Sequence, residues 1–308
     1  LVNNWPLVQA GKQSVEQAMA QLTENDTGRP LLAYRAPAHI KSRFGYNDTC
    51  TGFNYSSEKT RLSDVLAQIK AGFSDDEHEY LYINSLRFDQ GLPELSKANT
   101  LNFSHPEFTN NQPVPKIWIG TESVAAAHFD QPKNIACCVL GKRRFTLFSP
   151  EQVDNLYPGP LSPTPGGQVV TTANLDEPDF EKFPRLKTAL ENAWVADLEP
   201  GDGLYYPSMW WHEVRAFDRF NVMVNFWWMT AKPYLGNPMD LLMHGMLTLR
   251  DKPAEEKAAW RALFDYYVFG EGEKVIEHLP VECHGPLAQM DELSARRLRA
   301  MLLNNLNR

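Results

Sequence analysis

The sequence predicts a mainly β protein whose core is a sandwich or a barrel, with helices appended. Between residues 116 and 228, short apolar runs of strand length alternate with turns that contain Gly, Pro, Asp or Asn. Before this region helix-like and strand-like runs are mixed, and after about residue 232 apolar side chains recur at helical spacing. We therefore predict one unit over 1–232, with an α/β flank at its N-terminus, and a helical region over 233–308.

The flank begins with a helix signal. Ser14 and Gln17 form a capping-box pattern ahead of "VEQAMAQL", and "NDTG" at 25–28 ends that helix. A second amphipathic run predicts a helix over 60–72. The remaining segments are predicted as strands over 29–36 and 79–86 and as a loop-rich stretch over 92–115.

The β core follows. Its predicted strands cover 116–120, 125–131, 134–140, 142–148, 194–198, 203–206, 212–217 and 221–228. A Pro- and Gly-rich excursion at 157–168, "YPGPLSPTPGGQ", interrupts them. Many short strands joined by such turns are typical of a sandwich or barrel, and the loops at 92–115 and 157–168 are candidates for the mouth of a site.

The last region is helical. Pro238 stands at a helix start, and a second helix carries Trp260, Leu263, Phe264 and Tyr267 at helical spacing. A third helix repeats the pattern with Leu293, Leu298, Met301 and Leu302. Such stripes form a core or a subunit contact far more often than a cofactor site.

Composition narrows the class of protein. The formal net charge of −8 disfavours a broad nucleic-acid footprint, and no run approaches the roughly 18 apolar residues of a membrane span. The four cysteines, at 50, 137, 138 and 283, include no CxxC pair, so we expect reduced thiols and a cytoplasmic protein. The chain opens "LVNNWPLVQ", without Met, and we expect its N-terminus to be trimmed.

A histidine and a carboxylate stand two residues apart in "AAAHFDQPKN". In a strand, His128 and Asp130 point to the same face, with Phe129 on the other. His212, 82 residues after Asp130, follows a "EPGDGLYYP" turn and is the best third ligand. Two histidines and one carboxylate suit a non-haem Fe(II) oxygenase, whereas a structural zinc site takes four ligands. The same spacing also fits histidines that are hydrogen-bonded in the core and bind no metal.

Several linked motifs go beyond this spacing. From Glu79 to Trp228, "HFDQPKNIACCVLGKRRFTLFSPEQ", "LYPGPL", "LEPGDGLYYPSMWWHEV" and "VNFWW" occur in the order found in the JmjC/cupin-like oxygenases. The chain resembles this family, which includes the asparaginyl hydroxylase of hypoxia-inducible factor and the tRNA wybutosine hydroxylase. The resemblance implies a double-stranded β-helix (jelly-roll) core that uses Fe(II), 2-oxoglutarate and O₂.

The resemblance also implies roles for individual residues. His128, Asp130 and His212 match the iron ligands. The family places a lysine against the far carboxylate of 2-oxoglutarate, and the matching residue is Arg143, whose planar guanidinium is not equivalent to an ammonium. Lys142 is the alternative, although strand alternation turns it to the other face.

Further matches surround the expected cosubstrate. Tyr82 matches a tyrosine that binds the same carboxylate, with Tyr80 as the alternative on the same face. Asn134 and Asn225 match polar residues beside the cosubstrate, and a strand-end amide bonded to backbone fits them equally. The family's threonine three residues before the first ligand is Ala125, for which Ser123 is a candidate replacement. Tryptophans 210, 211, 227 and 228 either exclude water from the site or fill the core.

The sequence-based hypothesis is an Fe(II)- and 2-oxoglutarate-dependent hydroxylase that acts on a protein or peptide side chain. A tRNA or small-molecule substrate is the first alternative. A non-catalytic metal-binding sensor, favoured by Arg143 and Ala125, and a metal-dependent isomerase are the others. In the resembling hydroxylase, C-terminal helices pair two subunits, so we predict a homodimer formed through 233–308.

Overall fold

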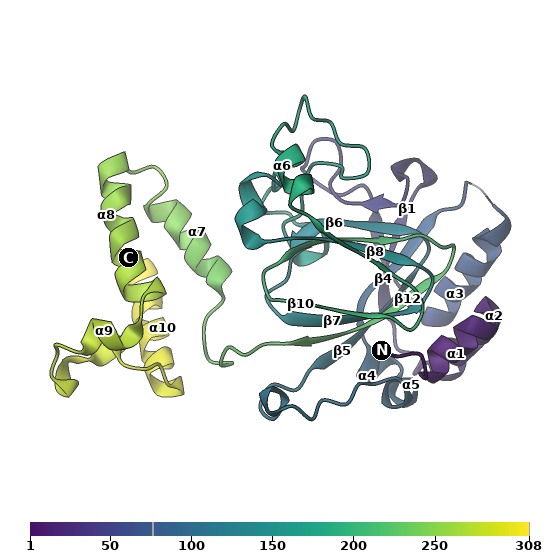
Figure 1. Cartoon of the computed structure of the whole chain (residues 1–308), viewed down its shortest axis with the longest axis horizontal. Coiled ribbons are helices and arrows are strands. Elements are labelled where there is room, and N and C mark those ends of the chain that lie inside the picture. Colours follow the sequence, from purple (N-terminus) through teal and green to yellow (C-terminus); the bar gives the residue numbers. More distant parts are fainter. Residues whose placement is uncertain (76, 308) are drawn as a thin grey trace. The chain divides into compact units, whose positions relative to one another are not determined.

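The computed structural model describes residues 1–75 and 77–307 and divides into two compact units, Leu1–Thr230 and the part that begins at Ala231 (Figure 1). The first unit holds two β-sheets. The larger has the strand order β10-β7-β12-β5-β4-β1-β3 and the smaller β2-β6-β11-β8-β9. The printed strand pairs are antiparallel except β2 with β6.

The strands of the larger sheet are β1 (Leu31–Ala36), β3 (Ser56–Thr60), β4 (Tyr80–Arg87), β5 (Val114–Gly120), β7 (Lys133–Leu140), β10 (Gly203–Tyr206) and β12 (Asn221–Trp228). Those of the smaller sheet are β2 (Arg43–Phe44), β6 (Ser123–Phe129), β8 (Arg143–Phe148), β9 (Trp194–Leu198) and β11 (Trp211–Ala216). Strands β5 to β12, four from each sheet, correspond to the eight that the sequence predicts, with ends that differ by at most two residues. Strand β6 ends at Phe129, so Asp130 lies in the following loop and not in the strand predicted over 125–131. The mainly β jelly-roll core with flanking helices is therefore confirmed.

Strand β12 is apolar on both faces apart from its two asparagines, because both faces are covered. Val222, Val224 and Phe226 pack outward against the N-terminal helices, whereas Met223 joins the cluster between the two sheets. Burial on both faces replaces the alternation of a half-exposed strand with a nearly continuous hydrophobic sequence.

The N-terminal helices α1 (Pro6–Gln13), α2 (Val15–Glu24) and α3 (Leu62–Ala71) cover the outer face of the larger sheet (Figure 1). The predicted cap of α2 is present, since the Gln17 backbone N–H donates to the Ser14 hydroxyl at 3.2 Å. The stretch 92–115 is less irregular than predicted, because α5 (Pro93–Ala98) follows α4 (Phe88–Gly91) there. A short helix α6 (Leu186–Glu191) packs outside the smaller sheet.

The second unit is helical, as predicted for this part of the chain. It contains α7 (Pro238–Thr248), α8 (Ala254–Phe264), α9 (Gly272–Ile276) and α10 (Glu292–Leu306), which starts at a capping box between Asp291 and Ser294. Its buried apolar side chains, among the residues described, are Val275 and Ala295. Throughout 1–75 and 77–307, the helices are too short or too polar to cross a bilayer.

Candidate metal centre

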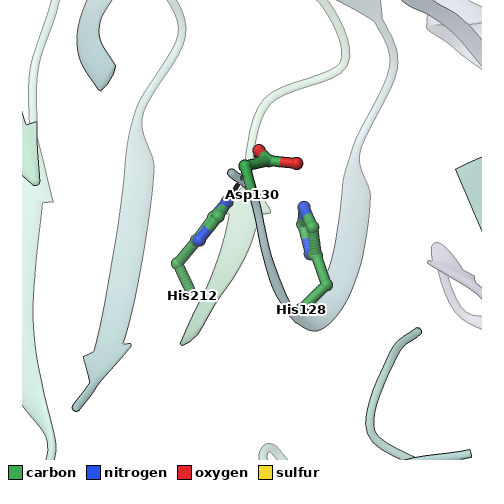
Figure 2. Close-up of side chains that lie close together, drawn as sticks. All are labelled: His128, Asp130 and His212. Atoms are coloured by element: carbon green, nitrogen blue, oxygen red, sulfur yellow. Dashed lines mark ion pairs between the residues drawn. The ribbon is translucent and has the colours of Figure 1, made fainter. Parts of the chain in front are cut away.

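Two neighbouring strands and the loop after one of them build a cluster of three ligand-type side chains. His128 on β6 lies directly opposite His212 on β11, so the two imidazoles share the face between the sheets. Asp130 follows two residues after His128. The ligand atoms of the three side chains all lie within 4.8 Å of one another, and both rings point toward the Asp130 carboxylate (Figure 2).

A bulge in β6 makes this arrangement possible. Along β11 two residues separate His212 from Val214, while their partners His128 and Ala125 on β6 are three residues apart. The extra residue shifts the alternation, so Ala125 and His128 both face the space between the sheets. The Asp130 loop is held in turn, since its backbone carbonyl accepts the Met209 N–H at 2.8 Å.

Each imidazole is oriented by its own strand. His128 Nδ1 lies 2.8 Å from the Ala126 carbonyl and His212 Nδ1 lies 3.0 Å from the Trp210 carbonyl, so both Nδ1 atoms donate. The lone pair of each Nε2 is then free, and His212 Nε2 lies 3.6 Å from Asp130 Oδ2. Histidine ligands in metal sites are oriented by this kind of bond from the second nitrogen.

The electrostatics favour a cation. Burial, reinforced by His212, lowers the pKa of His128 to about 4 and keeps that ring neutral. Burial alone would raise the pKa of Asp130, but its interactions with His212 and His128 outweigh burial and hold the pKa below its usual range. A metal ion bound by these three side chains would have coordination positions left for other ligands, as in non-haem Fe(II) sites.

Arg143 is a buried cation that forms no ion pair with the described part of the chain. Only 2% of the residue is exposed, and its Nε–H has no hydrogen-bond partner. Within 1–75 and 77–307 its guanidinium pairs with no carboxylate, and burial lowers its pKa. It alternates along β8 with Phe145 and Leu147, which belong to the cluster between the sheets, so it points into the same interior as the metal ligands.

The alternatives to Arg143 and Tyr82 make contacts of their own. Lys142 is exposed and pairs with Glu199 at 3.2 Å, so it lies outside this interior. Tyr82 lies near Arg143, whose charge opposes the burial that raises the pKa of Tyr82 to about 12. Tyr80 instead packs edge-on against His78, with ring centroids 5.1 Å apart.

The two asparagines belong to a hydrogen-bonded chain. Asn225 Nδ2 donates to Asn134 Oδ1 at 3.0 Å, Asn134 donates to the Tyr206 hydroxyl, and Trp118 Nε1 donates to Asn225 Oδ1 at 2.7 Å. The Tyr206 ring packs against His212 with centroids 4.7 Å apart. Burial first, and then the charge of Asp130, holds the pKa of Tyr206 well above its usual range.

Tyr206 and Trp118 are site residues that the sequence reasoning missed. The available signal was alternation, because Trp118 lies on the inner face of β5 and Tyr206 pairs directly with Asn134 across β10 and β7. Ser123 is buried at the start of β6. Ala125 has only a methyl group at the position where the family resemblance implies a threonine hydroxyl.

The four tryptophans divide between the two faces. Trp210 packs in part against the inner cluster, and Trp227 forms an edge-on pair with Trp118 at 5.9 Å. Trp211 packs outside the smaller sheet against Phe129. The Trp228 indole donates to Glu107 at 2.9 Å. Two of the four therefore line the interior and two stabilise the outer faces.

Comparison with known proteins supports the reading of these motifs. A family model described as a cupin-like domain matches residues 1–233. The chain is 26% identical over 165 residues to "Lysine-specific demethylase JMJ31" of Arabidopsis thaliana, covering 53% of this chain and 27% of that protein. It is 30% identical over 249 residues to "HSPB1-associated protein 1" of Rattus norvegicus, covering 75% and 50%.

A third relative, "tRNA wybutosine-synthesizing protein 5" of Mus musculus, is 37% identical over 172 residues, covering 51% of this chain and 49% of that protein. The matched region thus spans half or less of the length of these relatives.

The cluster makes a direct prediction about metal binding. His128→Ala and Asp130→Ala will each weaken Fe(II) or Mn(II) binding at least about 100-fold, since loss of even an outer hydrogen-bond partner costs 10- to 100-fold. The matched control is His39→Ala, which removes an exposed histidine. Equilibrium dialysis of the folded variants measures the effect. Unchanged affinity in Asp130→Ala would contradict the assignment.

Proposed function

The chain belongs to the cupin-like domain family, and on that premise we propose that it is an Fe(II)- and 2-oxoglutarate-dependent hydroxylase. The observation that carries the proposal is the buried guanidinium of Arg143, which pairs with no carboxylate of residues 1–75 and 77–307 and faces the same barrel interior as the His128, Asp130 and His212 cluster. The cluster supplies donors for a divalent cation, and the guanidinium supplies a counter-charge for a distant anion.

The residues fit both groups. His128, Asp130 and His212 would hold Fe(II), and a site with three protein ligands leaves coordination positions for a chelating keto acid. When bound, Fe(II) and 2-oxoglutarate would activate O₂ and place one oxygen atom on a substrate C–H bond. The protein's own part is to hold these groups in register and to keep water out.

Arg143 supplies the strongest argument for a dianionic cosubstrate. A buried, unpaired cation is costly, and a bidentate bond with a carboxylate removes much of that cost. Arg143 pairs with Ala216 on β11, four residues beyond His212, which is about 13 Å along a strand. Because the side chains of His212 and Arg143 both extend into the interior, the distance between a metal at His212 and the guanidinium is shorter than this, nearer to the length of a five-carbon diacid.

Three further residues would complete the cosubstrate site. Tyr82, beside Arg143, carries a phenolic O–H that burial keeps protonated, and it would donate to the same carboxylate. Asn134 on β7 and Asn225 on β12 are nearly inaccessible, at 2% and 0% exposure. Their side chains lie on the face of the larger sheet that is turned toward the smaller sheet. Each amide nitrogen has a second hydrogen that a bound carboxylate would satisfy.

We propose a protein or peptide side chain as the substrate. The Arabidopsis relative is named as a lysine-specific demethylase, which acts on protein, and the net charge of −8 disfavours a polyanion. The mouse relative is named for tRNA wybutosine synthesis, and this keeps tRNA as the competing substrate class.

Mass spectrometry decides between the two classes. Cell-extract proteins incubated with the enzyme, Fe(II) and 2-oxoglutarate should gain one oxygen atom on particular peptides, and Asp130→Ala should produce none. Oxygen appearing only in tRNA nucleosides would overturn the protein-substrate proposal.

The first unit is proposed as the catalytic domain and the second as a dimerisation region. Helices α7, α8 and α10 leave large apolar side chains exposed, among them Leu247 at 79%, Trp260 at 43% and Leu302 at 48%. Large exposed apolar surface of this kind marks an interface.

The dimer prediction is tested by light scattering. The wild-type chain should have twice the mass of one chain, and Leu302→Glu should shift it toward one chain, because a charge would enter the interface. Asn304→Glu, on the same helix, is the control and should stay dimeric. A wild-type mass of one chain would contradict the dimer.

The central prediction concerns Arg143. Arg143→Met should weaken 2-oxoglutarate binding to the Mn(II)-loaded protein at least about 100-fold, because losing one partner of a buried charge pair costs about 3–5 kcal/mol. The same change should raise the melting temperature of the empty protein, since it removes an uncompensated buried charge.

Lys142→Met is the matched control, because it removes an exposed positive charge at the adjacent position. It should leave binding unchanged. Calorimetric titration and thermal unfolding measure both effects. Wild-type-like binding in Arg143→Met would overturn the cosubstrate site.

A further inference from the structure

The hydrogen-bonded chain between the sheets has a fixed direction. It joins Trp118, Asn225, Asn134 and Tyr206, from β5 across β12 and β7 to β10. An indole N–H can only donate, so the atom of Asn225 that faces Trp118 must be its oxygen. The single donor at one end therefore decides how both amides are turned, which the shape of an amide alone would leave ambiguous.

The direction then follows link by link. With its oxygen toward Trp118, Asn225 presents its nitrogen to Asn134 and donates to the Asn134 oxygen at 3.0 Å. Asn134 must present its own nitrogen to Tyr206, and it donates to the hydroxyl oxygen. Every link donates away from Trp118, so the chain ends on the hydroxyl hydrogen of Tyr206.

This terminal hydrogen has no acceptor of its own. The Tyr206 oxygen is used as an acceptor for Asn134, and within 1–75 and 77–307 no side chain or carbonyl accepts from the hydroxyl. Tyr206 is only 3% exposed, so bulk water does not reach it readily. Buried donors are almost always satisfied, and a donor left over in a polar interior therefore points to a bound group.

The position of Tyr206 identifies which part of the site this group occupies. Its ring packs on the His212 imidazole at 4.7 Å, and its register partner on β7 is Asn134, four residues after Asp130. The hydroxyl therefore lies at the metal end of the barrel interior. Arg143, at the start of β8, lies toward the other end.

We propose that Tyr206 is a cosubstrate-binding residue whose hydroxyl donates to an oxygen of the 2-oxo-carboxylate end of 2-oxoglutarate, beside the metal. This inference rests on the proposed function and adds a residue to it. Trp118 acts as a positioning residue, because its indole sets the direction of the amides and so frees the Tyr206 hydrogen for the ligand.

The test uses binding, without turnover. Tyr206→Phe should weaken 2-oxoglutarate binding to the Mn(II)-loaded protein about 10- to 100-fold, the effect of losing a hydrogen bond to a charged acceptor. Under anaerobic conditions it should also shift the metal-to-ligand charge-transfer band of the Fe(II)-loaded protein with 2-oxoglutarate, because that band reports on the metal-bound end. Tyr205→Phe is the matched control, since Tyr205 is 52% exposed on the opposite face of the same strand, and it should change neither.

A second variant tests the direction of the chain. Trp118→Phe keeps an aromatic ring but removes the donor, so both amides can reverse and the Tyr206 hydroxyl can donate back to Asn134. Cosubstrate binding should weaken several-fold in this variant. Adding Tyr206→Phe to Trp118→Phe should reduce the 2-oxoglutarate affinity by a smaller factor than Tyr206→Phe does in the wild type. Fully additive effects would overturn the role of Trp118.

The outcomes separate this inference from the proposed function. If the wild-type metal-loaded protein does not bind 2-oxoglutarate, the proposed function fails. If the wild type binds and Tyr206→Phe matches it in affinity and in spectrum, the inference about Tyr206 fails and the function stands. If Tyr206→Phe does not fold, Trp118→Phe decides: weaker binding supports the inference, and unchanged binding overturns it.

Discussion

The buried charge of Arg143 is the constraint on which the rest of the site depends. A guanidinium at 2% exposure, with no carboxylate beside it among the described residues, lowers the stability of the empty barrel. The same charge becomes favourable when an anion enters, because the surrounding apolar cluster strengthens the attraction. The interior is thus prepared for a carboxylate at one end and, through His128, Asp130 and His212, for a cation at the other.

The two ends are joined by the strands themselves. Strand β11 carries His212 near its start and pairs with Arg143 near its end, so the spacing of the two charged groups is fixed by backbone hydrogen bonds. The bulge in β6 determines the position of the third group, because it places His128 opposite His212. A scaffold of paired strands holds His212 and Arg143 at a fixed spacing.

Much of the fold and part of the site could be predicted from the sequence. The eight core strands follow from apolar runs and turn residues, and alternation correctly separates Arg143 from Lys142. Helix α1 was missed because its N-terminus has no side-chain cap. Alternation could place Tyr206 on the inner face, but its hydrogen bond with Asn134, 72 residues away, arises only from the pairing of β10 with β7 and was missed. Its neighbour Tyr205 has the same side chain and faces outward.

The most direct test is a crystal structure of the full chain with Mn(II) and 2-oxoglutarate bound at the metal centre of its first unit. We expect His128, Asp130 and His212 to bind the ion, the keto-acid end of the ligand to coordinate it, and the far carboxylate to pair with Arg143. A diacid bound elsewhere, with the guanidinium of Arg143 still unpaired, would contradict the account.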